Sequence, residues 1–317
     1  MRSFAAAALI GAASAITQLE FDFMNYISAH GKSYANLAEY NSRFEMFAKK
    51  DAFIKAHDPV ATKYTVAHNK FSDWTDEEYK AILTYRSPGG WEQPEEPETE
   101  VPPLGANVNW VTNGCVNKIQ DQGQCGSCWA FSGTASTEGA WCIAHSQLLK
   151  LSEQQSVDCV TSCYGCNGGW AYKVFVYFES HYAMSESSYP YTAKDGTCKY
   201  SSTNHTSVKT TGYKNVTANS ISAMTTALGG HVLSVAIEAD QYAFQLYSGG
   251  VFTNTSCGTN LDHATNVVGN GTSGGIPYWY MRNSWGTGWG ASGYMYVEQV
   301  AGHGICGIQM EPNYALA

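Results

Sequence analysis

The first quarter of the chain has the apolar spacing of helices. Phe23 and Ile27 lie one helical turn apart, and Gly31 offers a stop after them. A second helix is predicted to begin at Asn36, with Glu39 at the third helical position of a capping box. Residues 16–86 contain no cysteine and are predicted to be helical.

One stripe of the second helix carries two kinds of side chain. Glu39 and Arg43 have the spacing of an i,i+4 ion pair. Phe47 and Ile54 supply apolar contact, and Asp58 ends the stripe. Taken alone, this pattern indicates an ordinary amphipathic helix.

A linker is predicted at residues 87–104, SPGGWEQPEEPETEVPPL, where five glutamates stand among prolines and glycines. After it, SGTASTEGAWCIAH and AYKVFVYFES suit helices. From about Gly212, the runs HVLSVAIEA, YWYMRNSW and GYMYVEQV suit strands. Helices followed by strands predict an α+β fold in two lobes, one over about 113–211 and one over about 212–317.

Composition and charge exclude some classes of protein. Of 317 residues, 44% are hydrophobic and 14% charged, which predicts a folded chain. The formal net charge of −9 disfavours nucleic acid as a partner.

The first fifteen residues, MRSFAAAALIGAASA, have the pattern of a cleaved signal peptide: a basic start, a short apolar run and an A-x-A site. The run is too short to span a bilayer, and we expect no membrane span elsewhere. In an exported chain the ten cysteines are expected to be bridged rather than metal-bound. We therefore expect no metal and no cofactor.

Four sequons are candidate glycosylation sites, at Asn204, Asn215, Asn254 and Asn270.

The segment DQGQCGSCWAFS places Cys125 and Cys128 three positions apart and has several interpretations. A zinc site would add Cys163 and Cys166, although the gap is long for a zinc ribbon. A redox couple would call for a thioredoxin-like βαβ context, which the pattern lacks. A nucleophile needs a base and an orienting group from elsewhere in the chain. NLDHATNVVGNG offers His263 at the edge of a strand, and YWYMRNSWGTGWG offers Asn283 at a strand end.

Together, QGQCGSCWAFS, LSEQQSVDC, YGCNGG, YPY, LDHA and RNSWGTGWG resemble the papain-like cysteine peptidases, such as cathepsin L. The resemblance implies a helical lobe, a β-barrel-like lobe and an active-site cleft between them. The N-terminal part resembles the family's inhibitory propeptide, including AHNKFSD through Asn69, Phe71 and Asp73. Lys50 and Asp58 stand where asparagine is usual in the family, and Ala67 stands where glycine is usual. These three departures are expected to weaken the inhibitor.

The resemblance also implies the role of each catalytic residue. Cys128 would be the nucleophile at the start of a helix, forming a thiolate–imidazolium pair with His263. The Gln122 side chain and the Cys128 N–H would stabilise the oxyanion. Asn283 would hold the imidazole, and Trp285 would shield that hydrogen bond from water.

The disulfide pattern follows from the same resemblance. It implies the bridges Cys125–Cys166, Cys159–Cys198 and Cys257–Cys306, and we predict Cys115–Cys142 as a fourth. Cys163 is left without an evident partner.

Substrate selection is expected to centre on the second residue before the scissile bond. The expected contacts are Gly168, Gly169, Trp170, Ala171, Ala236, Leu261, Ala264 and Trp285. Glu311 is expected at the far end of this apolar pocket, where a carboxylate can pair with arginine; the alternative is that Glu311 faces water. The stretch between YGCNGG and SSYPY has one histidine, His181, and no room for the blocking loop of cathepsin B. An open cleft implies an endopeptidase.

The leading interpretation is a zymogen with a signal peptide (1–15), an inhibitory propeptide (16–103) and a peptidase domain (104–317). Its partners would be polypeptide substrates, its own propeptide and cystatin-like inhibitors, and we expect a monomer. It would enter the secretory pathway, bound for a lysosome, a digestive vacuole or the exterior. Activation is expected to be acid-driven, through protonation of Asp73 and other carboxylates paired with bases at the propeptide interface. The alternatives are a thiol–disulfide oxidoreductase and a catalytically idle relative that binds or inhibits.

Overall fold

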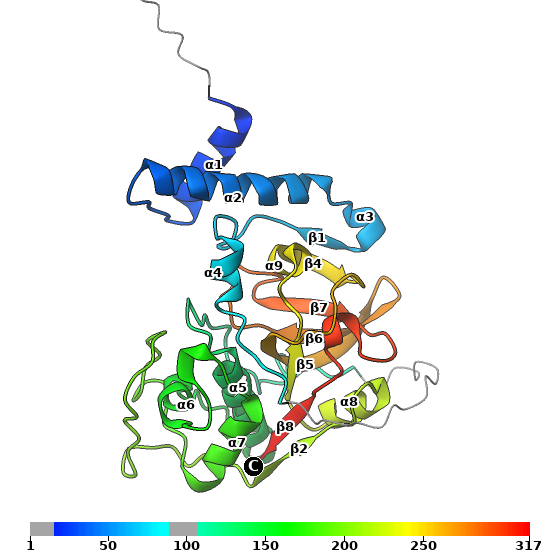
Figure 1. Ribbon diagram of the computed structural model, residues 1–317. Helices are drawn as coiled ribbons and strands as arrows, with labels where there is room; N and C mark the ends of the chain where they lie inside the picture. The colour runs from blue at the N-terminus through cyan, green and yellow to red at the C-terminus, as the bar shows by residue number, and fades with distance from the viewer. Residues whose placement is uncertain (1–15, 89–106) are drawn as a thin grey trace, which may run out of the picture.

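The computed structural model describes residues 16–88 and 107–317 (Figure 1). We refer to these two stretches as the N-terminal region and the C-terminal region. The predicted signal peptide at 1–15 and residues 89–104 of the predicted linker lie outside the described residues.

The first helix ends and the second helix begins where the sequence predicts. Helix α1 (Gln18–Ala29) is capped by Thr17 and followed by Gly31 at φ +58°. Helix α2 (Leu37–Ala56) is capped by the Asn36 side chain, which accepts from the Glu39 N–H at 3.0 Å. The reciprocal half of the predicted capping box is wrong, because the Glu39 carboxylate accepts from the N–H of Ala35 instead.

Apolar contact between these helices centres on aromatic rings. Phe23 of α1 is fully buried, and its ring centroid lies 5.1 Å from that of Phe47. Tyr34, Tyr40 and Phe44 surround the same ring. Of the predicted apolar stripe, Phe47 therefore contacts α1, whereas Ile54 is not part of this cluster.

The rest of the N-terminal region is less helical than the sequence predicts. Helix α2 ends before Asp58, whose carboxylate instead caps the short helix α3 (Pro59–Thr62). Strand β1 (Tyr64–Val66) then pairs antiparallel with a strand of the C-terminal region. Helix α4 (Asp76–Lys80) follows, with a full capping box between Thr75 and Glu78.

The C-terminal region opens with the helical lobe, as predicted. Helix α7 (Ala171–Ser180) has the predicted bounds, and the predicted helix start at Cys128 is confirmed by α5 (Cys128–His145). Nearly all of α5 is buried, so it forms the centre of this lobe. Helix α6 (Glu153–Cys159) and the 3-10 turn η1 (Gly165–Asn167) complete it.

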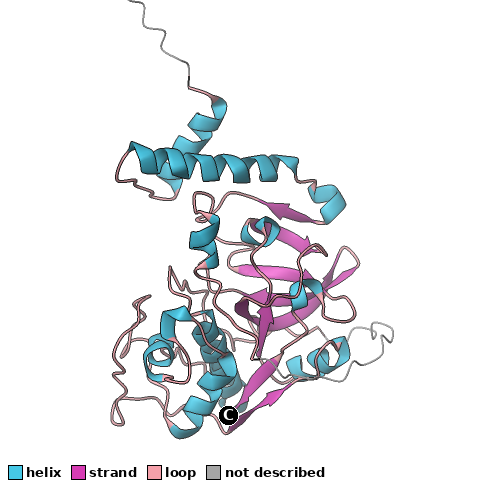
Figure 2. Cartoon of the chain, in the orientation of Figure 1, coloured by secondary structure: helices cyan, strands magenta, loops and turns pink. Residues whose placement is uncertain are grey.

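Within the described residues, the strands form one sheet in the order β1-β4-β7-β6-β5-β3-β8-β2 (Figures 1 and 2). Neighbouring strands are antiparallel, apart from the parallel pair β4·β7. The bounds are β2 (Gly212–Asn215), β3 (Leu233–Ile237), β4 (Tyr247–Phe252), β5 (His263–Ser273), β6 (Ile276–Arg282), β7 (Tyr294–Glu298) and β8 (Asn313–Leu316). Between them lie α8 (Ile221–Leu228), α9 (Tyr242–Gln245) and the turn η2 (Ile305–Gly307). The predicted α+β fold is confirmed.

The C-terminal strand returns to the helical lobe. Ala315 of β8 is fully buried and packs in one cluster with Ala140 of α5 and Phe175 of α7. This side-chain contact joins the sheet to the helix that begins at Cys128. Strand β8 accordingly runs beside α5 and α7 in Figure 1.

The structure contains the four disulfides Cys115–Cys142, Cys125–Cys166, Cys159–Cys198 and Cys257–Cys306. Because Cys125 is bridged to Cys166, the alternatives of a Cys125–Cys128 redox couple and of a zinc site are wrong. Over residues 16–88 and 107–317, no cluster of acidic, histidine and cysteine side chains could hold a metal. Nor does any helix of these ranges have the length and apolar character to span a bilayer.

The sequons differ in exposure. Asn204 and Asn215 are exposed, and Asn254 is half-buried. Asn270 is buried in β5, where its side-chain oxygen accepts from the N–H of Val108 at 2.8 Å. In the folded chain the Asn270 side chain is therefore not accessible to a glycosylating enzyme.

Candidate active site

Cys128 is the first residue of α5 and is fully buried. The preceding Ser127 makes no capping bond to the helix, because its hydroxyl lies 2.6 Å from that of Tyr191. The N-terminal end of the helix therefore places its partial positive charge at the sulfur.

His263, the first residue of β5, has a defined orientation. Its Nε2 lies 2.8 Å from Oδ1 of Asn283, and Asn283 is the residue that follows β6. That oxygen also accepts from the backbone N–H of Ser284 at 2.8 Å, which identifies it as the amide oxygen rather than the nitrogen. Nε2 must therefore carry the proton, and Nδ1 keeps a lone pair. Nδ1 is buried and has no hydrogen-bond partner among the described residues.

Trp285 covers this imidazole. The two ring centroids lie 4.5 Å apart at an interplanar angle of 23°. The indole is 1% exposed, so water is kept from that face of the histidine. Phe71 and Tyr79 of the N-terminal region pack edge-on against Trp285, and their ring centroids lie 5.1 and 5.7 Å from that of the indole.

Cys128 and His263 come from opposite lobes, and both are fully buried. Cys128 packs in a cluster with Ala264, the residue after His263. Burial raises the Cys128 pKa, and the backbone N–H of Ala264 is among the groups that partly offset this. Helix α5 and strand β5, whose first residues are 135 positions apart in sequence, thus lie together at this site.

The Gln122 side chain is buried beside them. Its oxygen accepts from the hydroxyl of Ser284 at 2.7 Å, so its amide nitrogen faces the site. That nitrogen donates to the carbonyls of Cys125 at 3.0 Å and of Ile82 at 3.3 Å. A backbone carbonyl of the N-terminal region therefore occupies the donor expected to bind an oxyanion.

Burial opposes the expected thiolate–imidazolium pair in the closed chain. Burial raises the pKa of the Cys128 thiol, although nearby N–H groups partly offset this. Burial also lowers the pKa of His263 to about 4, opposed by the hydrogen bond to Asn283. In the closed chain, burial thus favours a neutral thiol and a neutral imidazole. The thiolate–imidazolium pair stays a prediction for the open site.

The N-terminal region lies directly against the site. The Thr84 hydroxyl donates to the carbonyl of Gly126 at 2.6 Å, and the Tyr85 N–H donates to the carbonyl of Asp262 at 2.9 Å. A Cβ on Gly168, which has φ +115°, would lie 2.3 Å from the Thr84 carbonyl oxygen. Only glycine allows this approach.

Tyr85 fills the pocket predicted for substrate. Its ring packs with Ala236, Leu261 and Ala264, and Trp170 and Met310 border the same cluster. Glu311 is 4% exposed and its Oε2 accepts from the Tyr85 hydroxyl at 2.5 Å, so the alternative that Glu311 faces water is wrong.

Two of the expected substrate contacts, Gly169 and Ala171, do not belong to the cluster around Tyr85, and their contact with substrate stays a prediction. Ala171 packs into the cluster of Ala140, Phe175 and Ala315. A Cβ on Gly169 would meet Cys163 and Trp129, inside the helical lobe. Sequence analysis also missed Met310, Ser284 and Tyr85, which carry no signal that would separate them from ordinary core and linker residues.

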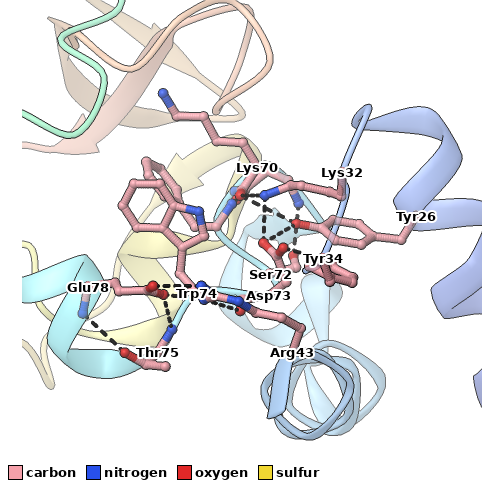
Figure 3. Close-up of polar contacts among 12 residues, drawn as sticks. Tyr26, Lys32, Tyr34, Arg43, Lys70, Ser72, Asp73, Trp74, Thr75 and Glu78 are labelled. Atoms are coloured by element: carbon pink, nitrogen blue, oxygen red, sulfur yellow. Dashed lines mark hydrogen bonds and ion pairs between the residues drawn. The ribbon is translucent and has the colours of Figure 1, made fainter. Parts of the chain in front are cut away.

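Asp73 forms the centre of a polar network within the N-terminal region (Figure 3). Its carboxylate accepts from Lys32 Nζ at 2.6 Å, from the Tyr26 hydroxyl at 2.8 Å and from the Tyr34 hydroxyl at 3.0 Å. Burial raises the pKa of both tyrosines, so both remain donors. The expectation that Asp73 pairs with bases across the interface is therefore wrong.

A second pairing in Figure 3 joins α2 to α4. Arg43 donates to both carboxylate oxygens of Glu78, one of them at 2.7 Å, and this pairing lowers the Glu78 pKa. The predicted pair with Glu39 is present at 3.8 Å. Lys50, where asparagine is usual, is fully buried and donates to the carbonyls of residues 71 and 74 at 2.7 Å each.

Ion pairs across the interface have the bases in the N-terminal region. Lys70 Nζ lies 2.6 Å from both carboxylate oxygens of Asp121. Lys80 Nζ lies 3.8 Å from Asp240. In both ion pairs the acid thus belongs to the C-terminal region.

Comparison with known proteins identifies the class to which this fold and site belong. Residues 104–316 match the papain family of cysteine proteases, and residues 23–79 match the cathepsin propeptide inhibitor domain I29. The chain belongs to the papain family and is a cysteine endopeptidase that carries its own inhibitory propeptide.

Its relatives share nearly the whole length. Senescence-specific cysteine protease SAG12 of Arabidopsis thaliana is 36% identical over 92% of this chain and 88% of its own. Digestive cysteine proteinase 1 of Homarus americanus is 38% identical, over 90% and 91%. Digestive procathepsin L 3 of the Tenebrio molitor larval midgut superposes with a TM-score of 0.84 at 33% identity, covering 95% of this chain and all of that one.

Proposed function

We propose that Cys128 and His263 together hydrolyse peptide bonds. The observation that carries the proposal is the orientation of His263: with Nε2–H held by Asn283, the free lone pair of Nδ1 is available for the thiol proton. Cys128 supplies that thiol at the positive end of α5. Once the propeptide leaves, water re-enters, and the burial that keeps both groups neutral is relieved.

The reaction has two stages. The thiol proton moves to His263 Nδ1, and the sulfur attacks the carbonyl carbon of the substrate. The resulting oxyanion accepts from Gln122 Nε2–H and from the Cys128 backbone N–H. His263 then gives the proton to the leaving amine as the C–N bond breaks, which leaves a thioester on Cys128. A water, deprotonated by His263, hydrolyses the thioester and restores the thiol.

The propeptide inhibits by occupying these groups. The Ile82 carbonyl uses the Gln122 donor, and the Tyr85 side chain fills the substrate pocket. We propose that acid opens this closed form, because protonation weakens the carboxylate pairs and charges the buried histidines.

Substrate preference is proposed to follow the pocket of Ala236, Leu261 and Ala264, with Glu311 at its end. This favours apolar residues, and also arginine, at the second position before the scissile bond. The Glu311→Ala variant should lose activity on Arg-Arg substrates more than on Phe-Arg substrates. An unchanged ratio of the two would refute this role.

The chain is proposed to enter the secretory pathway and to act in a lysosome, a digestive vacuole or outside the cell. Asn204, Asn215 and Asn254 are proposed glycosylation sites, cystatin-like proteins proposed inhibitors, and the monomer the proposed state.

The catalytic proposal is tested by Cys128→Ala. The acid-treated variant should show no peptidase activity while the zymogen still folds, because the substitution removes only the nucleophile. Cys163→Ala is the matched control: this second free thiol is also buried, and its variant should retain activity. Cleavage by Cys128→Ala at the wild-type rate would exclude the assignment.

A further inference from the structure

The carboxylate of Glu311 receives its hydrogen bonds from the propeptide. Oε2 accepts from the Tyr85 hydroxyl at 2.5 Å, and Oε1 accepts from the Ser87 hydroxyl. Within residues 16–88 and 107–317, no side chain of the protease domain donates to either oxygen, and no lysine, arginine or histidine forms an ion pair with it. When the propeptide leaves, Glu311 therefore retains two acceptor oxygens at the end of a pocket that supplies no donor.

Tyr85 shows what the pocket can hold. Its ring is 8% exposed and packs against the small side chains Ala236 and Ala264 and the larger Leu261. These leave an apolar slot of the width of an aromatic ring, with the carboxylate where the ring ends. Burial and the neighbouring Glu311 carboxylate raise the pKa of Tyr85, so the phenol stays protonated and remains the donor.

We propose that this pocket selects tyrosine over phenylalanine, with Glu311 accepting a hydrogen bond from the substrate's phenol. The inference rests on the proposed function, since it concerns the same pocket. A phenylalanine would fill the apolar slot but leave the buried carboxylate without a donor. A site built to bond a hydroxyl discriminates against the analogue that lacks it, because the unpaired group costs free energy.

The expected size of the preference follows from the kind of bond. A hydrogen bond to a charged acceptor is stronger than one between neutral groups. With some water able to enter an open cleft, we expect about a tenfold advantage for tyrosine in kcat/KM, at the lower end of what such a bond can give.

The test uses the acid-activated wild-type enzyme and three peptide substrates that differ only at the second residue before the scissile bond: tyrosine, phenylalanine and O-methyltyrosine. Tyrosine should exceed phenylalanine about tenfold in kcat/KM. O-Methyltyrosine, which fills the slot but cannot donate, should be no better than phenylalanine. Equal rates for tyrosine and phenylalanine, or a fast O-methyl substrate, would overturn the inference while leaving the proposed function intact.

The variant Glu311→Leu gives a second measurement. Leucine keeps an apolar end to the pocket and removes the acceptor, so the ratio of tyrosine to phenylalanine should fall to about one. A tenfold ratio retained in this variant would also overturn the inference. If the activated wild type cleaved none of the three substrates, the proposed function itself would fail, and the inference with it.

Discussion

The ammonium of Lys70 lies 2.6 Å from both carboxylate oxygens of Asp121, and this ion pair joins the propeptide to the protease domain. The Asp121 side chain is 45% exposed, so solvent screens the pair and its contribution is modest, about 0.5–1 kcal/mol.

The Lys70→Met variant should therefore mature a few-fold faster than wild type at the same acidic pH, because one link to the protease domain is lost. The rate of propeptide loss on a denaturing gel measures this. Lys80→Met is the matched control: its pair with Asp240 is longer, at 3.8 Å, and Lys80 is 62% exposed. Lys80→Met should change the rate less, and the reverse order would contradict the role given to Lys70.

The closed form should lose stability in acid through His263. Its pKa is about 4 in the closed chain, against an ordinary value of 6.5, because it is buried. The opened form then binds more protons between these values, so the closed form is favoured less as the pH falls from 6.5 towards 4. Burial lowers the pKa of His68 in the propeptide as well, and this acts in the same direction.

A zymogen that cannot cut itself separates this effect from catalysis. The melting temperature of Cys128→Ala should fall steadily over that window. A melting temperature that stays constant from pH 6.5 to 4 would show that these histidines do not drive opening.

The Asp73 network should decide whether the propeptide folds. Asp73→Ala leaves Lys32, Tyr26 and Tyr34 without their shared acceptor, and we expect a loss of about 2–4 kcal/mol in propeptide stability. The variant zymogen should leak activity at neutral pH. Glu45→Ala, an exposed carboxylate of α2, is the control and should not leak. A fully inhibited Asp73→Ala zymogen would exclude this role.

The bond between His263 and Asn283 should set the alkaline limit of activity. This bond raises the His263 pKa, so its loss in Asn283→Ala should move the alkaline limb of kcat/KM to lower pH. We expect kcat to fall by about one to two orders of magnitude, because the imidazole loses the bond that orients it for proton transfer. Asn113→Ala, on the surface, should leave the profile unchanged. An unshifted limb in Asn283→Ala would argue that the bond only supports the fold.

The sequence predicts some of these elements and not others for a physical reason. The helix at residues 171–180 has its own apolar period, and Asn36 caps α2 through residues three positions away, so local pattern is sufficient for both. Strand β1 was missed because Tyr64–Val66 gains its hydrogen bonds only from β4, about 180 residues later. A three-residue strand at a sheet edge has no periodicity of its own.

The residues of the site also divide into those that the sequence predicts and those that it does not. Family segments point to Cys128, His263 and Asn283, but no spacing could say that Asp73 bonds inward to Lys32 rather than across the interface. Nor could it say that Tyr85 would meet Glu311, which is 226 residues away in sequence. The opposite pKa shifts of Cys128 and His263 in the closed site were likewise not predictable, because they depend on burial by a separate segment of the chain.

Labelling of thiols tests the central claim most directly. Two cysteines, Cys128 and Cys163, are free in the described structure, and burial raises the pKa of Cys163 to about 11. The account predicts that a thiol-directed epoxide inhibitor leaves the intact zymogen unlabelled. After acid activation it should modify one residue per chain, mapped to Cys128 by mass spectrometry, with complete loss of peptidase activity. A label on Cys163 or on another residue, or full activity after Cys128 is modified, would contradict it.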